Sequence, residues 1–102
     1  MKLLTKKIEQ KLEKSPYGSK DGQGLDAEIV VKFFNPYGAG TWLITEGEKQ
    51  PDGDWLLYGY CHIDVWEWGS VLFSEIKNYR NSWGLGLERD LYVSGTVKEN
   101  IS

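Results

Sequence analysis

Residues 58–69, YGYCHIDVWEWG, gather the side chains of this chain with the most potential for chemistry. They include the only Cys and the only His, Cys61 and His62, as direct neighbours. A thiol and an imidazole can act as nucleophile and base, but adjacent residues of a β-strand point to opposite faces. One Cys and one His are also too few ligands for a zinc site without carboxylates. We therefore expect no catalytic pair and no metal here, and a packed cysteine instead.

Carboxylates offer a second chemistry, that of a small metal-dependent hydrolase. The candidates are Glu46, Glu88 and Asp90, with Lys32 as a strand-borne lysine beside them. Nothing in their spacing requires these acids to converge, and most Asp and Glu side chains lie on protein surfaces. Arg89 stands between two acids, and we expect it to form ion pairs that tie this segment to the sheet. The hydrolase stays an alternative to our main prediction, a protein that is not an enzyme and needs no cofactor.

Aromatic side chains are the richest signal, since the chain has five Trp and six Tyr among its 102 residues. Strand alternation places Trp66 and Trp68 on one face and Glu67 on the other. Such rings could stack nucleic-acid bases, but stacking platforms come with surrounding Arg and Lys, and here the neighbours are acidic. Aromatic rings rimmed by acids favour a protein partner, although filling of the core is the alternative. The predicted partner-binding residues are Tyr60, Asp64, Trp66, Glu67 and Trp68.

The elements that position these residues are predicted to form an α+β fold. We expect a small antiparallel sheet of about four strands, because β-rich runs alternate with turns of Gly, Pro and Asp. The predicted strands are residues 27–34, 41–46, 55–63 and 65–73. A short helix capped by Ser74 is expected to follow the fourth strand, with Ile76, Tyr79 and Trp83 facing the core. Trp42 and Trp55 are also expected in the core.

An N-terminal helix is predicted over residues 6–14. Thr5 is a suitable N-cap, and an apolar stripe recurs every four residues at Leu4, Ile8 and Leu12. The helix also carries a lysine face made of Lys7, Lys11 and Lys14. This face supports another alternative, a nucleic-acid-binding accessory protein. Residues 15–26, rich in Gly and small polar side chains, are expected to form a connecting loop that could also contact a partner.

Length and charge narrow the class of protein. A chain of 102 residues is expected to form a single domain, residues 1–102. Residues 1–20 carry a local charge of +4, whereas residues 21–102 carry −7, so the main body repels phosphates and attracts basic surfaces. The apolar runs are too short for a membrane span or a signal peptide, and the single cysteine excludes an intrachain disulfide. We expect a cytoplasmic protein.

Several segments in order resemble a family of small bacterial proteins that is recorded only as a domain of unknown function. These segments are KLLT, VKFF, TEG, EWG and ERDLY, beginning at residues 2, 31, 45, 67 and 88. Cys61 stands where that family usually has Val, which speaks against an ancestral role for the thiol. The resemblance implies no catalytic residue. It implies a setting in phages, plasmids and conjugative elements, in which small acidic proteins often block host defences or modulate replication and transfer.

Together these observations predict a small non-enzymatic protein-interaction module of a mobile element. Its expected role is inhibition of a bacterial defence complex, in the manner of an anti-CRISPR protein, by binding a basic nucleic-acid-handling surface. The expected partner is therefore a bacterial protein complex, such as a CRISPR effector. Direct nucleic-acid binding and a membrane contact are not expected, and the oligomeric state is left open.

Overall fold

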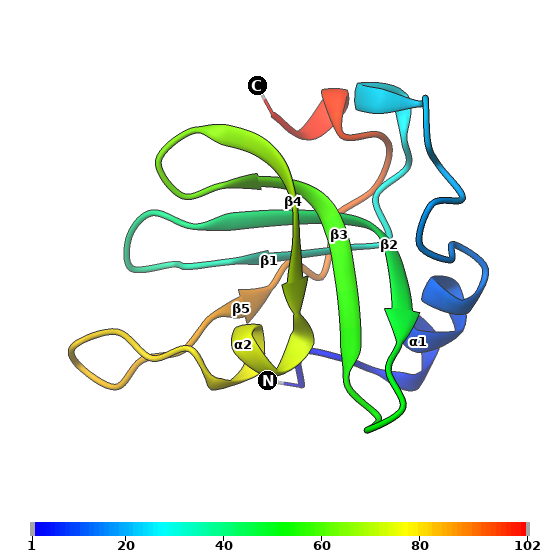
Figure 1. Cartoon of the computed structure of the whole chain (residues 1–102). Helices are drawn as coiled ribbons and strands as arrows, with labels where there is room; N and C mark the ends of the chain where they lie inside the picture. Colours follow the sequence, from blue (N-terminus) through cyan, green and yellow to red (C-terminus); the bar gives the residue numbers. More distant parts are fainter. Residues whose placement is uncertain (1, 102) are drawn as a thin grey trace.

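One antiparallel sheet of five strands forms the centre of the fold (Figure 1). The structure is a computed structural model, and it describes residues 2–101. The strand order is β4-β3-β2-β1-β5, and every neighbouring pair runs antiparallel. The bounds are β1 Val31–Phe34, β2 Thr41–Lys49, β3 Trp55–His62, β4 Trp66–Leu72 and β5 Glu88–Arg89. The mixed fold with one antiparallel sheet is thus confirmed, but the sheet has five strands rather than about four.

Two short α-helices flank the sheet, α1 Lys6–Glu13 and α2 Phe73–Asn78, and two 3₁₀ turns lie at Gly24–Asp26 and Lys98–Asn100. Helix α1 begins as predicted, because the Thr5 hydroxyl accepts a hydrogen bond from the Ile8 backbone N–H at 3.3 Å. Both helices pack on the same face of the sheet, which we call the core face. The buried core there consists of Leu12, Val31, Phe33, Ile44, Trp55, Leu57, Ile76 and Leu87.

Helix α2 is held at its start by a carboxylate from another element. The prediction that Ser74 caps this helix is wrong, since the helix begins at Phe73. The Ser74 hydroxyl donates to the Asp54 carboxylate at 2.6 Å, and the Ser74 backbone N–H donates to it at 3.0 Å. Asp54 also accepts from the Trp55 backbone N–H at 2.8 Å, which fastens α2 to the start of β3. The hydrogen bond from the Ser74 hydroxyl lowers the pKa of Asp54.

The segment after α2 departs most from the predictions. Ile76 is buried as expected, but Tyr79 is exposed and Trp83 is 79% exposed. The reason is that α2 ends at Asn78, so the helical spacing does not continue to these rings. Residues 79–86 instead form a loop in which Asn81 accepts hydrogen bonds from two backbone N–H groups. Of the three Trp expected in the core, Trp55 is buried, Trp42 is half-buried and packs against the core, and Trp83 is not core.

The C-terminal segment attaches to the sheet through side chains of β5 and of the residue that follows it. Arg89 lies in β5, and its guanidinium donates to the backbone carbonyl of Lys2 at 2.7 Å. Asp90 forms its ion pair with Lys32 of β1 at 3.6 Å. Farther along, Glu28 and Thr96 form a β-bridge, so residues that were predicted to begin the first strand pair with the C-terminal segment instead. No helix among residues 2–101 has the length and apolar character needed to cross a membrane.

Two local features distinguish β2 and β3, the strands that curve through the molecule in Figure 1. Gly59 of β3 lies so close to β2 that a Cβ would collide with the Leu43 carbonyl oxygen and the Ile44 Cα. In β2 a bulge lies between Ile44 and Glu46. A bulge adds one residue to a strand and thereby reverses its alternation. As a result Glu46 faces the side of the sheet opposite the core face, where Tyr58 is its cross-strand partner.

Candidate binding surface on strands β3 and β4

The side of β3 and β4 opposite the core face carries a continuous series of aromatic rings. Pairing of the strands places Tyr60 opposite Trp68 and His62 opposite Trp66. Their ring centroids are 4.8 Å and 5.1 Å apart. Tyr60 also stacks on Trp66 at 5.1 Å with an interplanar angle of 13°. We call the six rings in this series the aromatic face: Tyr17, Tyr58, Tyr60, His62, Trp66 and Trp68.

The other end of the aromatic face is built by Tyr58 and by a ring from the Gly-rich loop. Tyr58 stacks on Trp68 at 5.8 Å, again with 13° between the planes. Tyr17 lies 5.3 Å from Tyr58, and its hydroxyl forms a 2.6 Å hydrogen bond with the Ser70 hydroxyl. Ring contacts therefore run without a break from the loop, across β3, to the turn end of β4. Aromatic pairs at these distances stabilise each other beyond the area that they bury.

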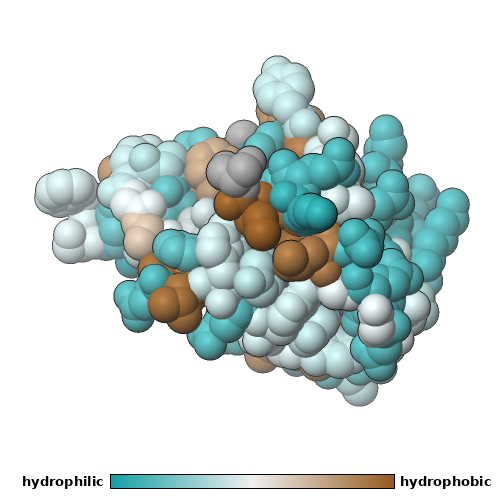
Figure 2. All heavy atoms as spheres, turned by 90° about the horizontal axis from the view of Figure 1, so that it is seen from above, coloured by the Kyte–Doolittle hydropathy of each residue, from teal (hydrophilic) through white to brown (hydrophobic). Residues whose placement is uncertain are grey.

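This surface is accessible in part. Trp68 is 37% exposed and Tyr17 is 42% exposed, while the other four rings are half-buried. Strand β4 is also the edge of the sheet, with β3 as its only neighbour among the described strands. In Figure 2, which looks at the molecule from above, most of the visible surface is pale or teal and the brown hydrophobic atoms form small patches. Trp and Tyr are near the middle of this colour scale, so an aromatic surface looks pale rather than brown.

The loop of residues 15–26 is fastened to the aromatic face by one buried carboxylate. Glu46 is 2% exposed, and its two carboxylate oxygens accept hydrogen bonds from the backbone N–H groups of Gly18 and Lys20, each at 2.8 Å. A carboxylate with two such donors is well satisfied even when it is buried. The loop is tied to β2 a second time, because the Gly47 backbone N–H donates to the Ser15 carbonyl at 3.1 Å.

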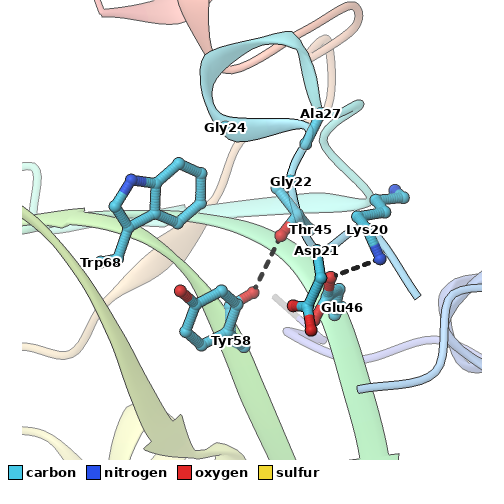
Figure 3. A pocket seen from close by; sticks show the side chains of 9 residues that line it. All are labelled: Lys20, Asp21, Gly22, Gly24, Ala27, Thr45, Glu46, Tyr58 and Trp68. Atoms are coloured by element: carbon cyan, nitrogen blue, oxygen red, sulfur yellow. Dashed lines mark hydrogen bonds between the residues drawn. The ribbon is translucent and has the colours of Figure 1, made fainter. Parts of the chain in front are cut away.

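Between this loop and the rings lies a pocket with a volume of about 260 Å³. Figure 3 shows Trp68 and Tyr58 on one side of it, and Asp21 and Glu46 on the other. The Lys20 side chain points away from the two rings, and its ammonium group donates to the Glu28 carbonyl at 2.8 Å. Burial lowers the pKa of Lys20. Burial raises the pKa of Tyr58, and Tyr17, Glu46, Asp21 and Cys61 raise it further.

The predicted binding residues fall into two groups in the structure. Tyr60, Trp66 and Trp68 come together on the aromatic face. Glu67 lies on the opposite side of the sheet, opposite Cys61 in the strand pairing. Asp64 is exposed in the turn between β3 and β4. The two acids therefore do not form one rim with the rings, and the acids that share a pocket with Tyr58 and Trp68 are Asp21 and Glu46.

Cys61 and His62 lie on opposite sides of the sheet, as the alternation of a strand requires. His62 belongs to the aromatic face. Cys61 is half-buried, and burial, with a smaller contribution from Glu67, raises the pKa of its thiol to about 11. A thiol with such a pKa is protonated and a poor nucleophile at neutral pH.

The three carboxylates considered for metal binding do not come together. Glu46 binds the Gly-rich loop, Asp90 pairs with Lys32, and Glu88 lies in β5. Within residues 2–101 there is no group of three or more His, Cys, Asp or Glu side chains arranged to hold a metal ion. The geometry therefore gives no support to the metal-dependent hydrolase.

Three of the six rings of the aromatic face, Tyr17, Tyr58 and His62, were not among the binding residues predicted from the sequence. Tyr58 and His62 lie two residues on either side of Tyr60, so alternation along the strand was a signal for both. Tyr17 comes from a loop without periodicity, and no pattern in the sequence predicts that its ring contacts Tyr58. The role of Glu46 was hidden as well, because it depends on the bulge in β2.

Comparison with known proteins gives a family and no activity. The family model described as "Protein of unknown function (DUF2958)" matches residues 3–101. No curated protein and no solved structure matches the chain. The match spans nearly the entire sequence, which confirms the expected kinship with an uncharacterised family. The chain therefore belongs to the DUF2958 family of proteins of unknown function.

Proposed function

We propose that this chain is a non-enzymatic protein-interaction module whose contact surface is the aromatic face. The observation that supports this proposal is the unbroken series of five contacts that joins the six rings on an accessible side of the sheet edge. Trp and Tyr provide large contact areas at a low cost in side-chain entropy, and they are enriched among the residues that dominate binding energies. The rings also hold one another in place before a partner arrives, which reduces the ordering that binding requires.

The charges around the rings favour a protein over a nucleic acid. Asp21 and Glu46 line the same pocket as Tyr58 and Trp68. A surface that binds single strands by stacking combines its rings with Lys and Arg, which neutralise the phosphates. Negative groups in these positions repel phosphates and attract basic protein surfaces.

The partner that we propose is a basic, nucleic-acid-handling surface of a bacterial defence complex, such as a CRISPR effector, in the cytoplasm. The charge of −7 over residues 21–102 suits such a surface. The choice of a defence complex follows from the mobile-element setting that the sequence resemblance implies. In this role the chain occupies the basic surface and keeps nucleic acid away from it.

Affinity capture with matched variants tests this proposal. The tagged chain, its Trp66→Ala/Trp68→Ala double variant and its Trp83→Ala variant are used as baits in bacterial lysates treated with nuclease. Trp83 is 79% exposed and lies outside the aromatic face, so it controls for the loss of an exposed Trp. We expect a near-stoichiometric protein partner with the wild type and Trp83→Ala, and its loss with the double variant. Equal recovery with all three baits contradicts the proposal.

The lysine face of α1 supports one second candidate, a nucleic-acid-binding accessory protein. Lys7 and Lys11 of α1 and Lys14 at its C-cap are all exposed. Phosphate contacts by these side chains require that binding weakens steeply with salt. Titration of the chain with single- and double-stranded DNA and RNA at low and moderate salt tests this candidate, and no binding at low salt removes it.

A further inference from the structure

We infer that the pocket between the Gly-rich loop and the aromatic face receives the guanidinium group of an arginine from the protein partner. This inference rests on the proposed function, and it names the chemical group that the aromatic face recognises. The pocket is bounded by the rings of Tyr58 and Trp68 and by the carboxylates of Asp21 and Glu46 (Figure 3). Aromatic rings combined with carboxylates suit an organic cation.

The charged groups that line the pocket carry a net negative charge, which favours a cation. Two carboxylates border it, against the single ammonium group of Lys20, which points away from the rings and donates to the Glu28 carbonyl. Glu46 is fixed by two backbone donors and has no ion pair among the described residues. The Asp21 carboxylate accepts no hydrogen bond from any residue between 2 and 101, so it is available to a ligand. One net negative charge therefore remains for an incoming group.

The size of the pocket points to one side chain rather than a whole small molecule. Its volume of about 260 Å³ is below the range of roughly 300–1,000 Å³ that is typical of small-molecule sites. The pocket also opens beside Trp68, an exposed ring of the surface that we propose for the partner. A side chain projecting from a partner docked on the aromatic face would enter it directly.

A guanidinium fits this pocket better than an ammonium for two physical reasons. It is planar and weakly hydrated, so it stacks on a ring face such as that of Trp68 with little loss of solvation. Its fork of N–H donors can also bond a carboxylate such as that of Asp21 while it is stacked. A lysine ammonium offers a compact charge that holds its water strongly and cannot stack in this way.

The test is an NMR titration of the ¹⁵N-labelled full chain with ethylguanidinium at constant ionic strength, with ethylammonium as the matched ammonium probe. We expect saturable shifts of the Trp68 indole N–H and of the backbone amides of residues 21–24, in the millimolar range because the ligand has few atoms. Affinity should fall by about fivefold or more in Asp21→Asn and in Trp68→Leu. Glu67→Gln removes the same charge from the opposite side of β4 and should leave the affinity unchanged.

Three results would overturn the inference. They are the absence of saturable shifts at Trp68, equal affinities of Asp21→Asn and Glu67→Gln, and equally tight binding of ethylammonium. Its failure can be told apart from failure of the proposed function. A protein partner that depends on Trp66 and Trp68 in affinity capture, together with no guanidinium binding, rejects only the arginine pocket. Guanidinium binding without any such partner rejects the proposed function and leaves a site for a small cation.

Discussion

Replacement of Glu46 by Gln should detach the Gly-rich loop from the sheet and destabilise the protein. In the wild type the two carboxylate oxygens of Glu46 accept from the backbone N–H groups of Gly18 and Lys20, at 2.8 Å each. A Gln side chain keeps one acceptor oxygen and turns an NH₂ group toward the second N–H donor. One charge-assisted hydrogen bond is therefore lost, and the other becomes a weaker neutral one.

The size of this effect follows from the burial of Glu46 and from the number of bonds. A hydrogen bond to a charged group contributes about 1.5–3 kcal/mol, and a buried donor left without a partner costs about 1–3 kcal/mol. Loss of one bond and weakening of the other should lower the free energy of unfolding by about 3 kcal/mol. For a domain of this size the melting temperature should fall by about 15 °C. Glu46→Ala, which removes both acceptors, should be more destabilising still.

Urea unfolding and amide hydrogen exchange measure the effect globally and locally. We expect a lower midpoint for Glu46→Gln and faster exchange at Gly18 and Lys20 than in the wild type. Glu48→Gln is the matched control, because Glu48 lies two residues farther along β2 and is exposed, so its change should stay within about 0.5 kcal/mol. If Glu46→Gln is as stable as Glu48→Gln and the two amides stay protected, the carboxylate does not hold the loop.

Three other substitutions or modifications test the fold around this site. Gly59→Ala should lower the free energy of unfolding by about 3 kcal/mol, because the added Cβ collides with the backbone of β2. Gly69 is the partner of Gly59 in β4 and has open space around it, so Gly69→Ala is the control and should be neutral or stabilising. Urea unfolding measures both variants. Asp54→Asn should be destabilising at pH 7. The Ser74 hydroxyl lowers the pKa of Asp54 below 3.8, so the ionised carboxylate stabilises the fold above that pH and loses this effect as the pH falls. The difference in the free energy of unfolding between Asp54→Asn and the wild type should therefore shrink toward pH 3. The Cys61 thiol, with its pKa raised to about 11, should be alkylated by iodoacetamide at pH 8 about ten times more slowly in the folded chain than in urea, and equal rates would contradict its burial.

The predictions from sequence succeeded where a local pattern and the final packing agree. The stripe that includes Leu12 and the Thr5 cap placed α1 within one residue of its observed end. The alternating apolar residues of β3 and β4 placed both strands within one residue at either end, because one side of each packs on the core. Alternation also predicted that Trp66 and Trp68 would lie on one face, and strand pairing brings Tyr60 to the same side.

The remaining features depend on contacts between distant segments, which no local pattern reveals. The bulge in β2 turns Glu46 toward the loop, and the ring of Tyr17 joins the face from more than 50 residues away from its partner Ser70. Trp83 looked like a core residue only while α2 was expected to continue past Asn78. The two-residue strand β5 is defined by its pairing with β1, and its own residues left open whether residues 87–93 form a strand or an irregular segment at the sheet edge.

Site-specific photo-crosslinking from the aromatic face tests the central claim most directly. A benzophenone amino acid replaces Trp68 in one version of the chain and Trp83 in another, and both are irradiated in bacterial cells. We expect a discrete protein adduct from position 68 and none from position 83, with a basic surface of the partner identified by mass spectrometry of the crosslinked peptide. Adducts to nucleic acid from position 68, or a protein adduct from position 83 alone, would contradict the assignment of the aromatic face as a protein-binding surface.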